Sequence, residues 1–294
     1  MSKQRITGDR PTYTAPIERY GKRTLAKGVE LLEDTKVTGL NNNVLVIGNS
    51  GCGKTGSYIC SVLKNIKSSV ILQDVKGLLY DMFAGELRAK GYNIIKLDFT
   101  EPEKSQGYNP LAAVKRNKDG SIYEPDVKAI ADAISPVNSG CKEPYWDMSA
   151  ASMIEFAIAY ALEALPKEYH NMTSVLELFH TYIQNNGDAY FVKWIKDNPN
   201  TLSTRLFSET QATRPSDRTF ASTAGIAASH LNCFNMKELR YIFNNKISVD
   251  LADIGRRKTA VFIKTSDTEH NLDNLVSLFY TQTLQALCRE ADNS

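Results

Sequence analysis

The chain has 294 residues, of which 42% are hydrophobic and 23% are charged, and its formal net charge is +2. This balance is typical of a soluble globular protein that buries a sizeable core, arranged as one large domain or two modest ones. Because the net charge is small, any contact with nucleic acid would have to come from local basic patches or from an oligomer.

The cysteine pattern indicates a reducing, cytoplasmic setting. The cysteines are odd in number and scattered, at Cys52, Cys60, Cys141, Cys233 and Cys288. No two of them have the spacing of metal ligands. The four histidines are isolated in the chain, which favours surface or hydrogen-bonded residues over ligands. No run of about eighteen apolar residues occurs, and the N-terminus lacks the apolar core of a signal peptide.

Residues 1–28 are polar and basic, and we expect an N-terminal arm that is poorly ordered up to about Pro16. The positive charge of this arm is expected to be simply solvated. Residues 29–39 then lead towards the first predicted strand.

A phosphate-binding loop is the strongest motif. Its pattern of glycine, four residues and Gly-Lys-Thr is formed by Gly48, Asn49, Ser50, Gly51, Cys52, Gly53, Lys54 and Thr55. The four apolar residues before it, 44–47, predict a buried strand, and the apolar spacing over 55–66 predicts a helix. Strand, glycine loop and helix together are the context that this motif requires.

The loop predicts a site for ATP and Mg²⁺. Glycines let several backbone N–H groups point at one phosphate, and the helix N-terminus adds its partial positive charge. Lys54 would contact the β- and γ-phosphates, and the Thr55 hydroxyl would ligate Mg²⁺. Cys52 is expected to be a small residue that fits the tight turn, although Lys54 and the loop amides could lower the pKa of its thiol.

An α/β pattern continues after the loop. Residues 69–74 and 92–99 read as strands, and the helix predicted between them, at 78–90, is ended by Gly91. The order β-α-β-α-β predicts a parallel sheet covered by helices on both faces, with nucleotide at the carboxyl ends of its strands. A further strand is predicted at 259–264 and a last amphipathic helix at 271–290.

Between residues 122 and 233 the strand signal disappears. We expect an all-α domain there, inserted into the nucleotide-binding domain formed by 29–121 and 234–294. Its helices are predicted at 126–134, 146–165, 174–183, 189–197, 202–210 and 219–231.

Several short stretches together resemble one family. They are Asn43–Gly48 with the loop, Asp74–Gly77, Gly91-Tyr92, Gly107–Pro110, Glu143–Asp147 and Leu275–Gln282. The chain, from about residue 25 to 290, resembles the cytosolic ATPase part of type IV secretion coupling proteins of the Gram-positive conjugative-element type. The resemblance implies a RecA-like motor domain interrupted by an all-α domain. It also implies ATP-driven coupling of a relaxase–DNA substrate to secretion-channel proteins, by a homo-hexamer at the inner face of the cell membrane.

Three departures from this family are expected to matter. The family's Asp-Pro-Lys-Gly-Glu is replaced by Asp74-Val75-Lys76-Gly77-Leu78. The usual transmembrane helices do not occur, and the sequence ends at Ser294, before the acidic Walker B strand and the arginine-finger region. We therefore expect part of a longer protein or a split gene product, which would be a poor ATPase by itself.

The roles of some acidic residues and basic runs remain open. Asp74 follows an apolar strand and is a candidate second Mg²⁺ ligand or a turn residue, and Asp98 is a weaker candidate of the same kind. Residues 265–267 would lie near the γ-phosphate if the strand before them pairs with the first strand, or would form a plain turn. Lys115–Lys118 and Arg256–Lys258 are expected to be solvated loops or DNA contacts.

Trp146 and Asp147 are expected to be a packing residue and a first-turn charge. Three classes of function stay open at this point. The first is the motor ATPase of a coupling protein. The others are a different P-loop phosphotransferase, and a non-catalytic substrate-docking module whose P-loop is vestigial.

Overall fold

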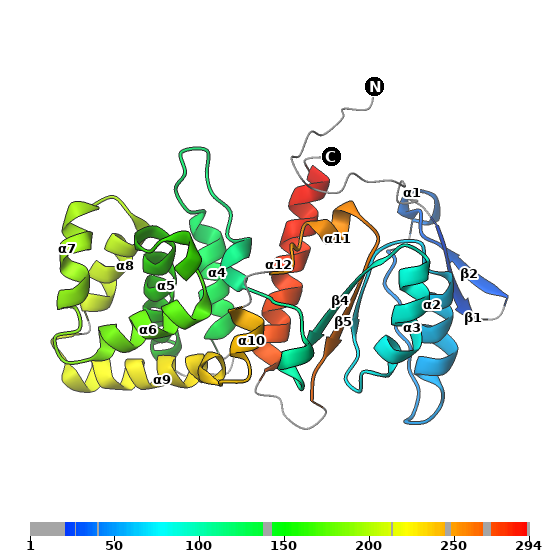
Figure 1. Ribbon diagram of the computed structural model, residues 1–294, viewed down its shortest axis with the longest axis horizontal. Coiled ribbons are helices and arrows are strands. Elements are labelled where there is room, and N and C mark those ends of the chain that lie inside the picture. The colour runs from blue at the N-terminus through cyan, green and yellow to red at the C-terminus, as the bar shows by residue number, and fades with distance from the viewer. Residues whose placement is uncertain are drawn as a thin grey trace.

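A three-stranded parallel sheet forms the centre of the α/β part of the chain, in the order β3-β5-β4 (Figure 1). The strands are β3 (Val70–Gln73), β4 (Asn93–Asp98) and β5 (Thr259–Lys264). The computed structural model describes residues 21–26, 28–39, 41–137, 143–212, 214–244, 248–266 and 272–292. The ranges predicted for these strands and for the helix between the first two are confirmed to within a residue or two.

β5 lies between two strands that precede it by more than 160 residues in the sequence, pairing Val261 with Ile71 on one side and with Ile95 on the other. Its residues 259–263 are fully buried, as expected of a central parallel strand. Ala260 and Phe262 pack on the helices of one face, α2 (Cys60–Asn65) and α3 (Leu78–Ala89). Val261 and Ile263 face the opposite way, towards α12 (Asp273–Asp292).

The helical part lies to one side of the sheet and connects β4 to β5 (Figure 1). Its helices are α4 (Glu124–Ile134), α5 (Tyr145–Ala164), α6 (Met172–Ile183), α7 (Ala189–Asp197), α8 (Leu202–Gln211), α9 (Asp217–Asn235) and α10 (Arg240–Phe243). They confirm the helices expected from the sequence, although α9 extends four residues beyond the predicted end. Short helical turns occur at Pro102–Lys104, Pro110–Ala113 and Lys167–Tyr169, and α11 (Asp253–Arg256) precedes β5.

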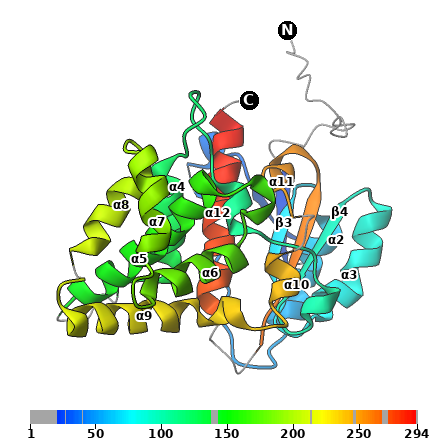
Figure 2. The ribbon, with the colours of Figure 1, turned by 60° about the vertical axis from the view of Figure 1, so that its left-hand side comes forward.

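Helix α5 is the core of the helical part. Apolar residues on all its sides are buried, which explains why an amphipathic stripe alone does not describe it. Phe156 contacts the rings of Tyr182, Phe191 and Phe207 with centroids 5.1, 5.2 and 5.5 Å apart. Figure 2 shows α5 enclosed by the helices α4, α6, α8 and α9. None of the described helices combines the length and apolarity needed to cross a bilayer.

The N-terminal region differs from its prediction. Residues 1–20 of the expected arm lie outside the described residues, but the end of that arm forms a strand, β1 (Lys22–Ala26), antiparallel to β2 (Val29–Leu32). Lys22 and Arg23 form ion pairs across this hairpin with Glu30 and Glu33, so part of the positive charge is paired. A single-turn helix, α1 (Thr35–Thr38), follows.

The buried strand predicted before the phosphate loop is wrong for this structure. Residues 44–47 form no strand, and Leu45 and Ile47 are 84% and 85% exposed. A strand needs a ladder partner, and neither edge of the described sheet, β3 or β4, pairs with this segment. The apolar β-branched run predicted burial, but a local pattern does not specify which backbone would supply the hydrogen bonds.

Candidate phosphate-binding loop and the carboxyl edge of the sheet

The loop of residues 48–53 has the backbone shape that its glycines predict. Gly51 and Gly53 have φ of 78° and 85°, in the left-handed region where residues with a Cβ are strained. A Cβ on Gly48 would lie 2.4 Å from Sγ of Cys52, so the loop closes on itself at these two residues. Among the described residues, no acceptor takes the N–H of Gly51 or of Gly53.

Lys54 folds back over this loop. Its Nζ donates to the carbonyl oxygens of Gly48 at 2.6 Å and of Asn49 at 2.8 Å, and lies 3.9 Å from Sγ of Cys52. The helix that follows begins as a π-helical segment, Lys54–Ile59, and continues as α2. The exposed side chain of Thr55 lies in its first turn, where N–H groups have no intrahelical acceptor. The predicted residues Gly48 to Thr55 therefore form one surface loop, closed by Lys54, in which the N–H groups of Gly51 and Gly53 have no described acceptor.

Asp74 is engaged in the turn after β3. Its carboxylate is buried and accepts the N–H of Tyr80 at 2.8 Å, and its carbonyl accepts the N–H of Gly77 at 2.9 Å. These contacts fix the start of α3, as a turn residue would. The structure describes no group of three His, Cys, Asp or Glu side chains that could hold a metal, at Asp74 or elsewhere in the described ranges.

Asp98, the weaker metal candidate, is the centre of a charged cluster at the ends of β4 and β5. Its side chain is fully buried, with Nζ of Lys96 at 2.8 Å and Nζ of Lys264 at 3.5 Å. It also accepts from the N–H groups of Thr100 and Glu101 at 3.0 and 2.8 Å. Burial raises the pKa of Asp98, but the hydrogen bond from Lys96 and those from Glu101 and Thr100 outweigh it and hold the pKa below its ordinary value.

This cluster was not predicted as a unit. Lys264 pairs directly opposite Asp98 across the two strands and also contacts Glu101 at 3.1 Å. The sequence predicts that polar residues at the ends of parallel strands share one edge of the sheet. It does not give the order of the strands, so it could not show that Lys264 lies opposite Asp98. The two lysines already neutralise Asp98, so the structure assigns it to a buried ion pair that joins β4 to β5.

Thr265 and Ser266 lie at the carboxyl end of β5, and Asp267 lies outside the described residues. They line a cavity of about 380 Å³ with Gln73 and Val75 from the end of β3 and with residues of α12. A γ-phosphate contact was expected only if the strand before these residues pairs with the strand predicted before the loop. It does not, because β5 pairs with β3 and β4 and not with residues 43–47. The cavity is nevertheless at the sheet edge where nucleotides bind in α/β folds.

Comparison with known proteins identifies the family. The profile of the type IV secretory system conjugative DNA transfer family matches residues 2–294. The chain belongs to this family. A search of curated proteins finds no match.

Two solved structures of a coupling protein share the fold of this family member. The bacterial conjugative coupling protein TrwBdeltaN70, unbound, aligns with a TM-score of 0.55 and 16% identity over 95% of this chain and 57% of that one. The plasmid coupling protein TrwB with the non-hydrolysable ATP analogue ADPNP aligns with a TM-score of 0.52 and 16% identity over 92% and 62%. The fold is thus the RecA-like P-loop α/β fold, and the chain spans about three-fifths of these proteins' length.

Three of the other basic candidates, Arg116, Arg256 and Arg257, form contacts within the chain. Arg116 donates to the carbonyl of Leu162 at 2.8 Å, and Arg256 and Arg257 pair with Glu290 and Asp253 at 2.8 and 3.2 Å. Trp146 donates to Glu143 at 2.8 Å near the start of α5. These contacts favour structural roles over binding ones.

Proposed function

We propose that this chain is the nucleotide-binding part of a conjugative coupling protein and that loop 48–55 binds ATP with Mg²⁺. The observation that carries this proposal is the position of Lys54, whose ammonium group lies within 2.8 Å of two carbonyl oxygens of the loop. A triphosphate would offer that ammonium group anionic partners, and charge-assisted hydrogen bonds are about twice as strong as neutral ones.

The residues present fit the ligand. The N–H groups of Gly51 and Gly53 lack protein acceptors in the described chain and would bind phosphate oxygens, while the Thr55 hydroxyl would ligate Mg²⁺. Mg²⁺ would neutralise charge on the β- and γ-phosphates. Asp74 could serve as a second ligand through Oδ1, because its hydrogen bond from Tyr80 uses Oδ2. ADPNP bound to TrwB supports the choice of an adenine nucleotide.

The remaining roles follow from the family. We propose that nucleotide turnover in the whole protein drives a relaxase–DNA substrate towards secretion-channel proteins, in a homo-hexamer at the cytoplasmic face of the cell membrane. In this division, 29–121 and 234–294 bind nucleotide and 122–233 forms the all-α domain. The arm expected at 1–28 is not separate at its end, where β1 pairs with β2. The helical connection between β4 and β5 supports this division.

A non-catalytic docking module is the alternative that one observation favours, because the helical part contains the large groove described below. A titration with a fluorescent ATP analogue and Mg²⁺ distinguishes the two. Lys54→Ala removes a charged donor and is expected to weaken binding by about 1.5–3 kcal/mol, roughly ten- to a hundredfold. The control is Lys64→Ala, an exposed lysine of the same helix, which should bind as wild type does. Equal affinities of wild type and Lys54→Ala would instead support the docking module.

A further inference from the structure

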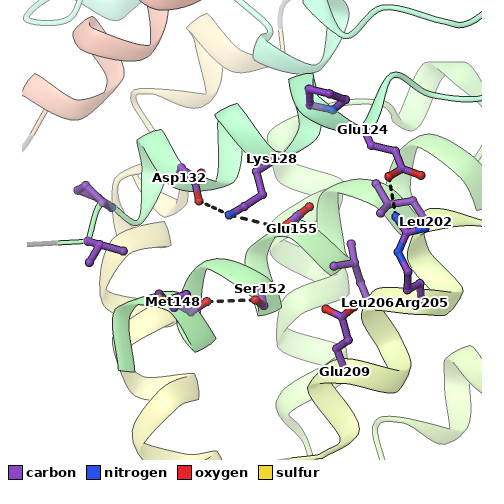
Figure 3. Close-up of a pocket in the computed structure, with 13 residues that line it drawn as sticks. Glu124, Lys128, Asp132, Met148, Ser152, Glu155, Leu202, Arg205, Leu206 and Glu209 are labelled. Atoms are coloured by element: carbon purple, nitrogen blue, oxygen red, sulfur yellow. Dashed lines mark hydrogen bonds and ion pairs between the residues drawn. The ribbon is translucent and has the colours of Figure 1, made fainter. Parts of the chain in front are cut away.

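A groove of about 900 Å³ crosses the helical part, between α4, α5 and α8 (Figure 3). We call it the acidic groove. Its acidic and basic lining residues are Glu124, Lys128, Asp132, Glu155, Arg205 and Glu209. Apolar side chains, among them Met148 and Leu206, line the rest of it.

Both cations of the acidic groove are already paired. Arg205 contacts Glu124 at 2.6 Å, and Nζ of Lys128 contacts Asp132 at 2.6 Å. Glu155 and Glu209 are therefore in excess. In the view of Figure 3, Leu206 lies between these two carboxylates, which come from α5 and α8. The groove combines uncompensated negative charge with an apolar floor.

Glu155 is the unusual member, because it is only 6% exposed although it lines an open groove. Its nearest cation, Lys128, is 4.0 Å away and is closer to Asp132. Burial raises the pKa of Glu155, and the charges of Asp132 and Glu209 add to the effect, while Lys128 and Arg205 oppose it. The Glu155 carboxylate lines the open groove, so a cation entering the groove could form a closer, charge-assisted contact with it than Lys128 does.

The shape of the surface favours a polypeptide over a small cation. Two further hollows adjoin the acidic groove and share Glu209 with it, one along α8 and one towards Tyr145 at the start of α5. Met148 and Tyr145 are 58% and 51% exposed along this surface. Exposed apolar side chains beside acids suit an amphipathic partner. Nucleic acid is disfavoured because its phosphates would face Glu155 and Glu209.

We propose that the acidic groove binds a cationic amphipathic segment of a partner protein, with lysine or arginine side chains on Glu155 and Glu209 and apolar side chains against Met148 and Leu206. Electrostatic complementarity of this kind gives specificity and fast association. The inference does not depend on the proposed nucleotide site, since all its residues lie in the helical part.

The test is a display screen of short random peptides against the whole chain, counter-selected on a Glu155→Gln/Glu209→Gln variant. The recovered peptides are expected to be rich in lysine or arginine interspersed with leucine or aromatic residues. In anisotropy titrations, each single Glu→Gln change should weaken the best peptide about tenfold, the loss of one charge-assisted contact. Met148→Ser should weaken it less, and Glu177→Gln, an exposed acid on α6 outside the groove, should change nothing.

Four results would overturn the proposal. Three are recovery of peptides without basic residues, equal binding to the double variant, and equal binding of a peptide whose residues are scrambled to remove its apolar face. The fourth is displacement by spermine at equal charge concentration, which would show a site for small polycations instead. Lys54→Ala should leave peptide binding unchanged. Peptide titrations therefore test the groove, and titrations with the ATP analogue test the nucleotide site, independently of each other.

Discussion

Arg289 of α12 and Asp126 of α4 form a two-pronged ion pair that ties the last helix to the first helix of the helical part. Nη1 of Arg289 donates to Oδ2 of Asp126 at 2.9 Å, and Nη2 donates to Oδ1. Asp126 is buried and also accepts the N–H of Lys115 at 3.0 Å. The pair therefore joins segments that are 163 residues apart.

Asp126→Asn should destabilise the chain by about 1–3 kcal/mol, because the change removes the buried charge that pairs with the half-buried Arg289 and accepts the N–H of Lys115. Urea unfolding measures this free energy. The matched control is Glu86→Gln, which breaks the exposed pair of Glu86 with Lys90 at 2.6 Å and should cost less than about 0.5 kcal/mol. Equal effects would show that the α4–α12 pair does not contribute beyond an ordinary surface pair.

Gly48→Ala should weaken binding of an ATP analogue, since the new Cβ would lie 2.4 Å from Sγ of Cys52 and force that side chain or the loop to move. Adding Cys52→Ala removes that sulfur and should restore most of the affinity. The change Cys52→Ala alone should have little effect. A double-mutant cycle on analogue affinity therefore should show strong coupling between the two residues, and additivity would mean that the loop does not close as described.

The buried carboxylate of Asp98 should stabilise the fold. Its pKa is lowered in the folded state, so its contribution is present above its ordinary value of 3.8 and is lost as the pH falls through the lower pKa of the folded chain. Asp98→Asn is expected to cost about 1–3 kcal/mol at neutral pH, with the difference from wild type shrinking in acid. Urea unfolding as a function of pH measures this, and a difference that grows in acid would contradict the assignment.

Glu155 should behave in the opposite way. Its pKa is raised in the folded state, so its stabilising contribution is fully present below its ordinary value of 4.5 and is lost as the pH rises through the higher pKa of the folded chain. Glu155→Gln should therefore leave stability at neutral pH unchanged or increase it, with the gain vanishing in acid. Glu177→Gln serves as the exposed control. A large loss of stability at neutral pH would show that Glu155 is structural.

The local elements could be predicted because their signals are local. The glycines and lysine of 48–54 specify a cradle by themselves, since left-handed φ at Gly51 and Gly53 needs no distant partner. The helices of the helical part follow from apolar spacing, and β5 from its buried β-branched run. The family resemblance, carried by short stretches spread over the chain, was confirmed by the match over residues 2–294.

Only the tertiary structure decided which strands, helices and charged groups these elements contact. The order β3-β5-β4 depends on pairings across more than 160 residues, and it places Lys264 opposite Asp98. The same dependence explains why residues 44–47, apolar and β-branched, are exposed where no described strand pairs with them. Glu155 lies among mostly apolar residues of α5, and only the packing of α4 and α8 beside it shows that it lines an open groove. Periodicity reports which side of an element is apolar, whereas hydrogen-bond partners and charge pairs depend on contacts that the chain makes only when folded.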